Sequence, residues 1–443
     1  MNSIGYWDPE QAMFWSETGR RIAWRTLWIT TGALLLSFAT WFMMSAVVVR
    51  LPAIGFQFST MELFWLAAMP GLAGGTLRIA HTFLIPLYGT RTVVSVSTFL
   101  KLLPVIGVGL AVSDPATPWW LFMLLAFMAG FGGGDFSSYM PSTSLFFPKR
   151  LQGTALGIQA GIGNFGVSIA QFLTPWIIGL AVFGTFGGGG QVMRLQGTVS
   201  TVYLQNAAFI YVPFLLLMGA LAWVYLRRVP VRASFREQLD IFHNKHTWFC
   251  TITYVMTFGS FSGLSAAFPL MIKTVYGDFA GAPDPLTYAF IGPLIGSAVR
   301  VAFGPVADRF GGGILTHLVG LGLLATALVI VFSGVLTPEN LDSFPLFVAF
   351  MLLMFFFSGV GNASTFRQYP VIFAHSPRQA AGVIGWTAAV AAYGPFLFSL
   401  LIGWSISATG SATMFFIFAA AYYLVATLIN WWFYTRKGAE QPS

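Results

Sequence analysis

Cysteine and charged residues are both scarce in this sequence of 443 residues. The single cysteine, Cys250, excludes a disulfide framework and any metal site built from several thiolates. Aspartate and glutamate number only 14 against 22 lysines and arginines, and charged residues make up 8% of the chain. Because soluble domains carry about 25% charged residues, this composition excludes an ordinary soluble globular domain.

Hydrophobic residues, at 56% of the chain, replace the missing charges. They form stretches long enough to cross a hydrocarbon layer of about 30 Å as helices. We predict twelve membrane-spanning helices, at residues 27–49, 61–86, 92–112, 119–147, 153–180, 204–226, 247–272, 286–306, 313–335, 344–373, 380–407 and 412–434. The expected fold class is an all-α membrane protein in contact with the lipid bilayer.

The basic residues predict the orientation of these helices. If the arginine-rich segment 20–25 is cytoplasmic, fifteen lysines and arginines fall on that side, and only Arg50, Arg194 and Lys273 fall outside. Cytoplasmic loops carry such an excess of positive charge. We therefore expect a multi-pass protein of the cell (inner) membrane with both termini cytoplasmic. Because the charges lie in short loops rather than on one basic face, nucleic-acid binding is not expected.

The sequence repeats itself across its longest basic loop. Six predicted helices precede this loop and six follow it, and Arg78 in the first set corresponds to Arg300 in the second at a shift of 222 residues. Between helices 4–5 and 10–11 the shift is 229, which matches Pro141 with Pro370. We expect a six-helix half at 1–226 with an interfacial N-terminal segment, a cytoplasmic linker at 227–246 and a second six-helix half at 247–443. Two similar halves around a central site are typical of transporters.

Arg78 and Arg300 lie deep inside predicted helices. An arginine at that depth costs at least a few kcal/mol unless it faces protein or water. Among the acidic residues only Asp135 lies equally deep, and one carboxylate cannot neutralise these two arginines together with Arg367. We therefore expect the two symmetric arginines to bind an anion. The alternative is that each pairs with a buried carboxylate and only holds helices together.

A guanidinium group is planar and donates hydrogen bonds in a fork, which suits a small, flat oxyanion. Phe136, Phe258 and Phe366 are candidates for the rings above and below such an anion, although packing alone also explains them. In the fifth predicted helix, Asn164 lies close to Gly161 and Gly163. These glycines let helices approach and slide, and Asn164 contacts either the substrate or only this tight seam.

Several of these segments resemble one family. Residues 157–168 (GIQAGIGNFGVS) resemble the first nitrate signature of the nitrate/nitrite porter (NarK-type) family of the major facilitator superfamily. Residues 130–149 and 364–373 resemble its fourth and tenth helices, and 308–312 resembles the Asp-Arg-x-Gly loop of the superfamily. The resemblance implies a major facilitator fold with twelve helices in two pseudo-symmetric halves, and a transporter rather than an enzyme.

The resemblance also implies which residues bind the anion and which molecules the protein acts on or works with. The resemblance implies that Arg78 and Arg300 clamp the anion. It also implies that Asn164 and Tyr254 donate hydrogen bonds to the anion, and that the rings of Phe136, Phe258 and Phe366 sandwich it. The implied substrates are nitrate and nitrite, with a functional link to a nitrate reductase, a monomeric state, no cofactor and no metal. The implied activity is nitrate-in, nitrite-out antiport by alternating access.

Two other functions stay open. A nitrate or nitrite/proton symporter needs a titratable group near the site, and Asp135 falls where the family commonly shows asparagine. We expect Arg367 to pair with Asp135, because the repeat places Arg367 opposite Ser138. His81, three residues after Arg78, is a further candidate for a coupling role, as Gly161 and Gly163 are for gating. The distant alternative is a haem-bearing membrane subunit of a respiratory enzyme, which needs paired intramembrane histidines.

Overall fold

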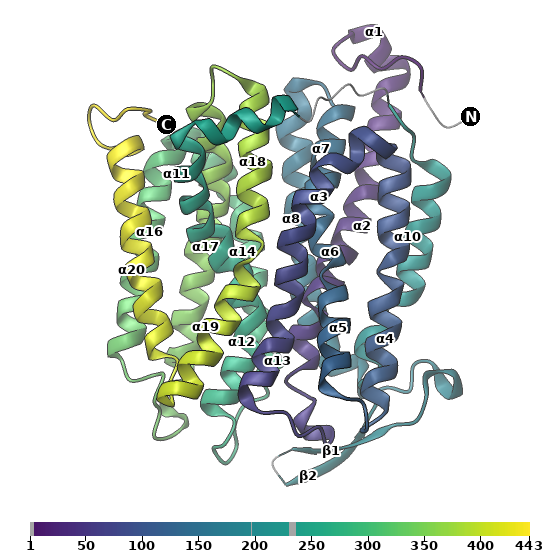
Figure 1. Cartoon of the computed structure of the whole chain (residues 1–443), viewed down its shortest axis with the longest axis vertical. Coiled ribbons are helices and arrows are strands. Elements are labelled where there is room, and N and C mark those ends of the chain that lie inside the picture. Colours follow the sequence, from purple (N-terminus) through teal and green to yellow (C-terminus); the bar gives the residue numbers. More distant parts are fainter. Residues whose placement is uncertain (1–3, 196, 230–235) are drawn as a thin grey trace.

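Helices dominate the computed structural model, which describes residues 4–195, 197–229 and 236–443. Twelve helical spans in these residues are long and apolar enough to cross a membrane, as the sequence predicts. Six lie before residue 227 and form what we call the first half; six begin at residue 245 or later and form the second half. In Figure 1 the first half lies on the right and the green and yellow helices of the second half lie on the left.

The elements of the first half are α1 (Ala12–Phe14), η1 (Trp15–Gly19), α2 (Arg20–Val47), η2 (Pro52–Ile54), α3 (Thr60–Leu100), α4 (Leu102–Ser113), α5 (Trp119–Ala129), α6 (Phe131–Gly134), α7 (Phe136–Phe146), α8 (Lys149–Ile177), η3 (Gly184–Gly187), β1 (Gln191–Leu195), β2 (Thr198–Val202), α9 (Asn206–Phe209) and α10 (Tyr211–Tyr225). Those that follow are η4 (Arg236–His243), α11 (Lys245–Tyr254), η5 (Val255–Gly259), α12 (Ser260–Tyr276), α13 (Pro285–Ala289), α14 (Ile291–Ala302), α15 (Gly304–Phe310), α16 (Gly312–Phe332), η6 (Leu341–Ser343), α17 (Phe344–Ile372), α18 (Pro377–Ala391), α19 (Gly394–Thr409), α20 (Thr413–Asn430) and η7 (Trp431–Thr435).

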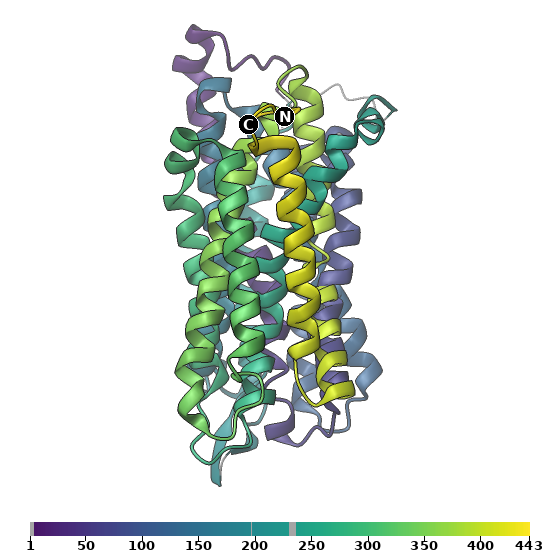
Figure 2. The same ribbon diagram turned by 90° about the vertical axis from the view of Figure 1, so that its left-hand side faces the viewer.

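Both ends of the described chain lie at the same end of the molecule, as an even number of spans predicts (Figure 1). The short helix η4 lies there too, and we call this the termini end. The opposite end carries the strands β1 and β2, and we call it the hairpin end. Figure 2 faces the second half and shows its long helices running side by side between the two ends. Residues 230–235 of the expected linker lie outside the described residues.

Two left-handed glycines mark corresponding turns in the two halves. Gly89, with φ of 79°, interrupts α3 where the second span gives way to the third. Gly311, with φ of 89°, separates α15 from α16 in the second half. Residues with a Cβ rarely adopt such φ values. These two glycines are related by the same shift as Arg78 and Arg300, so the internal repeat has a backbone counterpart.

Two segments differ from the sequence-based expectations. The N-terminal aromatic segment packs on the turn between α7 and α8: the Trp7 indole donates to the Leu145 carbonyl (3.0 Å), and Trp15 packs on Phe147. The loop between the fifth and sixth spans forms an antiparallel hairpin, with Gln191 opposite Val202. This hairpin was not predicted from the sequence, because each of its strands has only five residues.

The two halves are fastened together at the hairpin end. Ser168 of α8 donates to the Phe290 carbonyl (2.8 Å), and Gln171 donates to the Ser265 carbonyl (2.7 Å). Arg50 of the first half and Asp284 of the second form an ion pair. The two hydrogen bonds hold α8 to the second half, and the ion pair links the turn after α2 to the start of α13.

The seam between the halves opens toward the termini end. A Cβ added at Gly161 of α8 would lie 2.7 Å from Val301 of α14 in the second half. One turn nearer the termini end on the same face of α8, a Cβ at Gly157 would meet no atom within 4 Å, and Gly153 is equally open. Gly385 of α18 has the same open surroundings. The halves therefore touch as far as Gly161 and diverge beyond it.

Candidate anion site between the halves

Arg78 is fully buried on α3 at the boundary between the halves. Its Nε donates to the Gly133 carbonyl of α6 (2.8 Å), and its Nη1 donates to the Ala388 carbonyl of α18 in the second half (2.7 Å). Its Nη2 has no hydrogen-bond partner. No ion pair links Arg78 to a carboxylate among the described residues. Its positive charge is therefore uncompensated, and one nitrogen remains free to donate.

Arg300 contributes the second guanidinium group, from α14 in the other half. It is 7% exposed, its Nη1 lacks a hydrogen-bond partner, and no carboxylate pairs with it in the described parts of the chain. The Phe366 ring, which covers Arg300, lies 5.5 Å from the Tyr254 ring, and Tyr254 lies 5.5 Å from the Phe258 ring, which covers Arg78. The structure thus brings together two like charges that the sequence predicts to meet.

The three predicted phenylalanines all stack on these guanidinium groups. The Arg78 Cζ atom lies 4.8 Å from the centre of the Phe136 ring and 5.3 Å from that of Phe258, which belongs to the opposite half. The Arg300 Cζ atom lies 4.8 Å from the Phe366 ring. The face of an aromatic ring attracts a cation without neutralising it. The rings therefore stabilise the two charges while leaving them available to an anion.

Asn164 lies on α8 beside this cluster, with its side chain fully buried. Neither atom of its amide has a hydrogen-bond partner, which is costly for a buried polar group unless a ligand supplies one. The glycines around it pack against both halves: Gly161 faces Val301, next to Arg300, and Gly163 faces Leu34 of α2. Asn164 thus lies one turn from the position where α8 contacts the second half, with its amide free.

Asp135 is not partnered as the sequence suggests. Its carboxylate is fully buried and pairs with Lys101, and it also accepts hydrogen bonds from Ser97 and from Ser37 (2.6 Å). The predicted pairing of Asp135 with Arg367 is therefore wrong. The Arg367 side chain is 42% exposed near the end of α17, whereas the Asp135 carboxylate is buried inside the first half, so the two side chains cannot meet.

Arg367 instead pairs with Asp308, whose carboxylate lies 2.9 Å from the arginine Nε. Both side chains are well exposed, at 42% and 71%. Arg367 is therefore not one of the buried charges of the site. The positive charge at the site belongs to Arg78 and Arg300.

His81 lies on α3 one turn from Arg78 and is largely buried. Its Nδ1 atom is 3.0 Å from the Ser138 hydroxyl and 3.7 Å from the Asp135 carboxylate. The histidine thus faces the Asp135 cluster rather than the free nitrogens of the two arginines.

Four neighbours of the site went unrecognised in the sequence. Trp41 lies 5.3 Å from the Arg78 Cζ atom, and the Ala388 carbonyl accepts from that arginine. Lys101 is the partner of Asp135. Asn362, four residues before Phe366 on α17, is fully buried with both amide atoms unpartnered, like Asn164. For Asn362 a signal existed: it is an amide in a membrane span, four residues before the predicted site residue Phe366.

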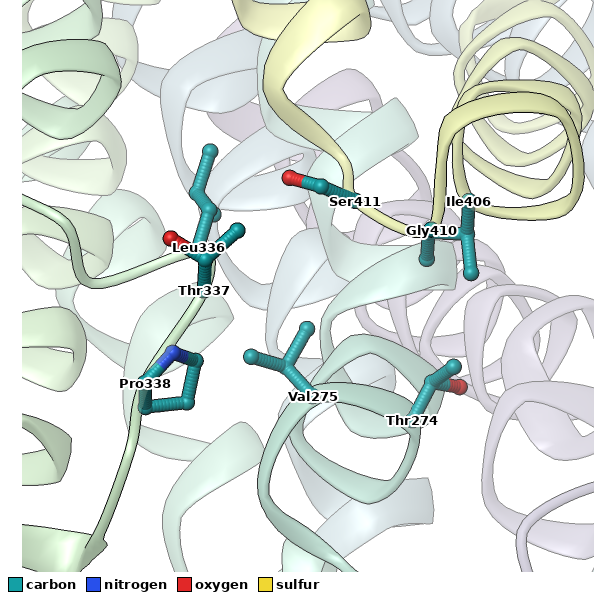
Figure 3. A pocket seen from close by; sticks show the side chains of 8 residues that line it. All are labelled: Thr274, Val275, Leu336, Thr337, Pro338, Ile406, Gly410 and Ser411. Carbon is teal, nitrogen blue, oxygen red and sulfur yellow. The ribbon is translucent and has the colours of Figure 1, made fainter.

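A recess of about 260 Å³ at the hairpin end lies away from this cluster (Figure 3). Its lining consists of Thr274, Val275, Leu336, Thr337, Pro338, Ile406, Gly410 and Ser411. These residues carry no charge, and they all belong to the second half. The recess has neither the chemistry nor the position of a site between the halves.

Comparisons with known proteins agree with this architecture. The model of the Major Facilitator Superfamily matches residues 29–375. Among solved structures, a bacterial homologue of the human lysosomal transporter Spinster, in an inward-facing and unoccupied conformation, superposes with a TM-score of 0.68. That match covers 92% of this chain and 97% of the other at 16% identity, and it supports the fold alone.

Two sequence relatives cover almost the whole chain. One is a probable nitrate/nitrite antiporter, NarK2, of Thermus thermophilus, 61% identical over 437 residues, or 98% of this chain and 97% of the relative. Another is the nitrate/nitrite transporter NarU of Salmonella typhimurium, 37% identical over 98% of this chain and 96% of the relative. Both are transporters, so the alternative of a haem-bearing enzyme subunit is set aside. The chain belongs to the Major Facilitator Superfamily and, within it, to the NarK-type family of nitrate/nitrite transporters.

Proposed function

We propose that this chain exchanges nitrate for nitrite across a cell membrane by alternating access, with the anion held between Arg78 and Arg300. The unpaired Nη2 of Arg78 and Nη1 of Arg300 carry this proposal. They are buried donors from opposite halves, and no carboxylate within the described residues pairs with either arginine. A small oxyanion between them would accept from both donors and offset one of the two positive charges.

The surrounding groups favour a flat anion. Phe136, Phe258 and Phe366 lie with their ring centres 4.8–5.3 Å from the guanidinium carbons, so a planar anion in the plane of the forks would lie between rings. Asn164 has an amide ready to donate, and Tyr254 would add its hydroxyl. The names of the relatives supply the identity of the anions: nitrate and nitrite.

Exchange follows from the repulsion between the two arginines. Closing the empty site would press two uncompensated charges together as water leaves, and the energy of that repulsion rises as the local dielectric constant falls. A bound anion offsets the repulsion and attracts both halves. The loaded carrier therefore changes conformation faster than the empty one, which couples the entry of one anion to the exit of another.

Proton-coupled uptake is the second candidate function, with Asp135 as its titratable group. The Asp135 carboxylate already has an ammonium partner and two hydroxyl donors. These partners favour its charged form and work against its use as a proton carrier. We therefore place exchange before symport.

The setting of the transporter is part of the proposal. We propose that the protein lies in the cell (inner) membrane as a monomer, with the termini end cytoplasmic, and that it works beside a nitrate reductase. The moving units would be residues 1–226 and 247–443, joined by the linker 227–246. The excess of lysine and arginine toward the termini end supports this orientation.

Counterflow in proteoliposomes tests the proposal. Purified protein is reconstituted into vesicles loaded with nitrite, nitrate or no anion, and labelled nitrate is added outside at equal pH on both sides. Exchange predicts rapid uptake into nitrite- or nitrate-loaded vesicles and slow uptake into empty ones. Equal uptake into empty vesicles that depends on an imposed proton gradient would establish symport instead. No nitrate uptake under any condition would refute both.

A further inference from the structure

A second buried charge cluster lies directly behind Arg78. Asp135 lies at the junction of α6 and α7, and its carboxylate pairs with the Lys101 ammonium at the end of α3; both side chains are completely buried. The carboxylate also accepts from Ser97, on α3, and from Ser37, on α2. One carboxylate thus ties together three elements of the first half.

This cluster is connected to the anion site through the main chain. Two residues before Asp135, the Gly133 carbonyl accepts the hydrogen bond from the Arg78 Nε (2.8 Å). One residue after it, Phe136 lies with its ring centre 4.8 Å from the Arg78 Cζ atom. Any displacement of Asp135 would therefore move two of the three contacts that the first half makes around this guanidinium group, the third being the Trp41 ring.

The segment that carries these contacts has a low intrinsic helix propensity. It contains Gly130 and the run Gly132–Gly134, and each glycine is about 1 kcal/mol less favourable in a helix than alanine. The span is interrupted on both sides of α6. The glycines allow close contact: a Cβ at Gly132 would lie 2.2 Å from the Ser37 carbonyl oxygen. An anchor outside the glycine run is needed to fix it.

We propose that the Lys101–Asp135 pair is the positioning element of the anion site: it holds the Gly133 carbonyl and the Phe136 ring against Arg78. Because the pair has no net charge, it leaves the charges of Arg78 and Arg300 uncompensated. The affinity of the site for the anion therefore does not change with pH. This inference rests on the proposed function, because it concerns the same site.

Asp135 faces charged and titratable groups on two elements. On α3 these are Lys101, His81 at 3.7 Å and, one turn from the histidine, Arg78. On α7 the nearest titratable group is Tyr139, whose hydroxyl donates to the Val94 carbonyl of α3 (3.3 Å). From α2 the contact is the uncharged Ser37 hydroxyl. If Lys101 is lost, the unpaired carboxylate would offset part of the arginine charge that attracts the anion.

The variant Lys101→Met tests the electrostatic half of the inference. We expect its dissociation constant for nitrate to be about tenfold or more above that of the unaltered protein at pH 8, because an unpaired buried charge is expensive and repels an anion. The affinity should recover toward pH 5 as Asp135 takes up a proton. The unaltered protein should show the same affinity from pH 5 to pH 8.

The double variant Asp135→Asn with Lys101→Met tests positioning without a buried charge. We expect nitrate binding several-fold weaker than in the unaltered protein and independent of pH, because the anchor is gone but no charge is stranded. An affinity equal to that of the unaltered protein would overturn the positioning role. This variant also keeps the test decisive if Lys101→Met fails to fold.

Binding is measured on the purified full-length protein by titration calorimetry with sodium nitrate, with thermal unfolding as the check on folding. Lys273→Met is the matched control, because Lys273 lies in α12 with a buried ammonium that lacks a hydrogen-bond partner; its nitrate affinity should be unchanged. The titration is repeated with His81→Gln added to Lys101→Met. A pH dependence that vanishes in that background belongs to His81 and overturns the assignment to Asp135.

The two proposals fail in different ways. If the unaltered protein binds no nitrate at any pH, the proposed function is wrong. If it binds nitrate and Lys101→Met binds equally well at pH 5 and pH 8, only the role of the Lys101–Asp135 pair is refuted.

Discussion

The two arginines occupy symmetric positions but different surroundings. Arg78 is fully buried, donates to two main-chain carbonyls and touches three aromatic rings. Arg300 is 7% exposed and stacks on Phe366. Arg78 is therefore held in place before any anion arrives, whereas Arg300 has fewer fixed contacts. We expect Arg300 to make the larger adjustment on binding.

Replacing either arginine by lysine should abolish exchange without unfolding the protein. The ammonium keeps the charge but loses the planar fork. A hydrogen bond to a charged group is worth about 1.5–3 kcal/mol, so nitrate affinity should fall roughly 10- to 150-fold. Counterflow of labelled nitrate measures the loss for Arg78→Lys and Arg300→Lys. Arg194→Lys, on the exposed hairpin, is the matched control, and near-normal exchange by either site variant would disprove the clamp.

Phe258→Ala should weaken nitrate binding and relax the choice of anion. The Phe258 ring covers Arg78 from the opposite half, and a cation–π contact of this kind contributes about 0.5–2 kcal/mol. The measurement is competition of nitrate uptake by larger oxyanions. Phe332→Ala, at a ring that is 83% exposed, is the control. Unchanged selectivity and affinity in Phe258→Ala would remove this ring from the site.

At the scale of helices, the features that depend on long hydrophobic runs could be predicted from the sequence. Features that depend on a single contact between two residues could not. The twelve spans, the turn near Gly89 and the meeting of Arg78 with Arg300 follow from hydropathy, from glycine and from the repeat. The Asp135–Arg367 pairing was wrong because the register of the repeat does not tell whether a side chain points into the protein, as that of Asp135 does, or outward, as that of Arg367 does. The Ala388 carbonyl could not be predicted, because every residue carries such an acceptor.

Gly166→Ala should destabilise the first half. A Cβ at Gly166 would lie 2.2 Å from the Leu35 carbonyl oxygen and 2.8 Å from the Ala39 nitrogen, so α2 and α8 must move apart. Overpacking of this kind costs about 1–3 kcal/mol. Thermal unfolding of the purified protein should show a lower midpoint. Gly157→Ala, where the added methyl group meets nothing within 4 Å, should leave the midpoint unchanged; equal midpoints for the two variants would contradict this packing.

The contact between η4 and α18 should depend on pH. Hydrogen bonds from Arg378 and Gln379 hold the pKa of Asp240 below its ordinary value of 3.8. A depressed pKa means that this contact stabilises the folded state above about pH 4 and that the contribution is lost as the pH falls through the folded-state pKa. Thermal unfolding of the unaltered protein and of Asp240→Asn should differ at pH 7 and converge below pH 4. A constant difference across that range would show that charge plays no part.

At the scale of the whole molecule, the halves are joined at the hairpin end and diverge toward the termini end. The ion pair between Arg50 and Asp284 and the hydrogen bonds of Ser168 and Gln171 close one side. The open positions at Gly153, Gly157 and Gly385 lie on the other. In the proposed orientation these open positions face the cytoplasm.

Asp284→Asn should loosen the closed side. The Arg50 side chain is 4% exposed in the ion pair, so loss of the carboxylate leaves a buried charge unpaired. A cysteine introduced at Ala67, which is 3% exposed on α3, should then react faster with a maleimide added from the hairpin side. The native thiol of Cys250 is fully buried and should give little background. Reversal of the pair, Arg50→Asp with Asp284→Arg, should restore slow labelling; unchanged labelling in Asp284→Asn would show that the pair does not hold the gate.

The Ala388 contact has a consequence for how this transporter can be dissected genetically. In the absence of an anion, the link from Arg78 to the opposite half ends on a peptide oxygen. A side-chain substitution at 388 leaves that oxygen in place, and an alanine scan skips the position because it is already alanine. Since the Ala388 side chain is 1% exposed, a mutational library would report only whether a larger side chain can be packed there. Only an edit of the backbone itself, such as an ester in place of the amide at that carbonyl, would expose its contribution.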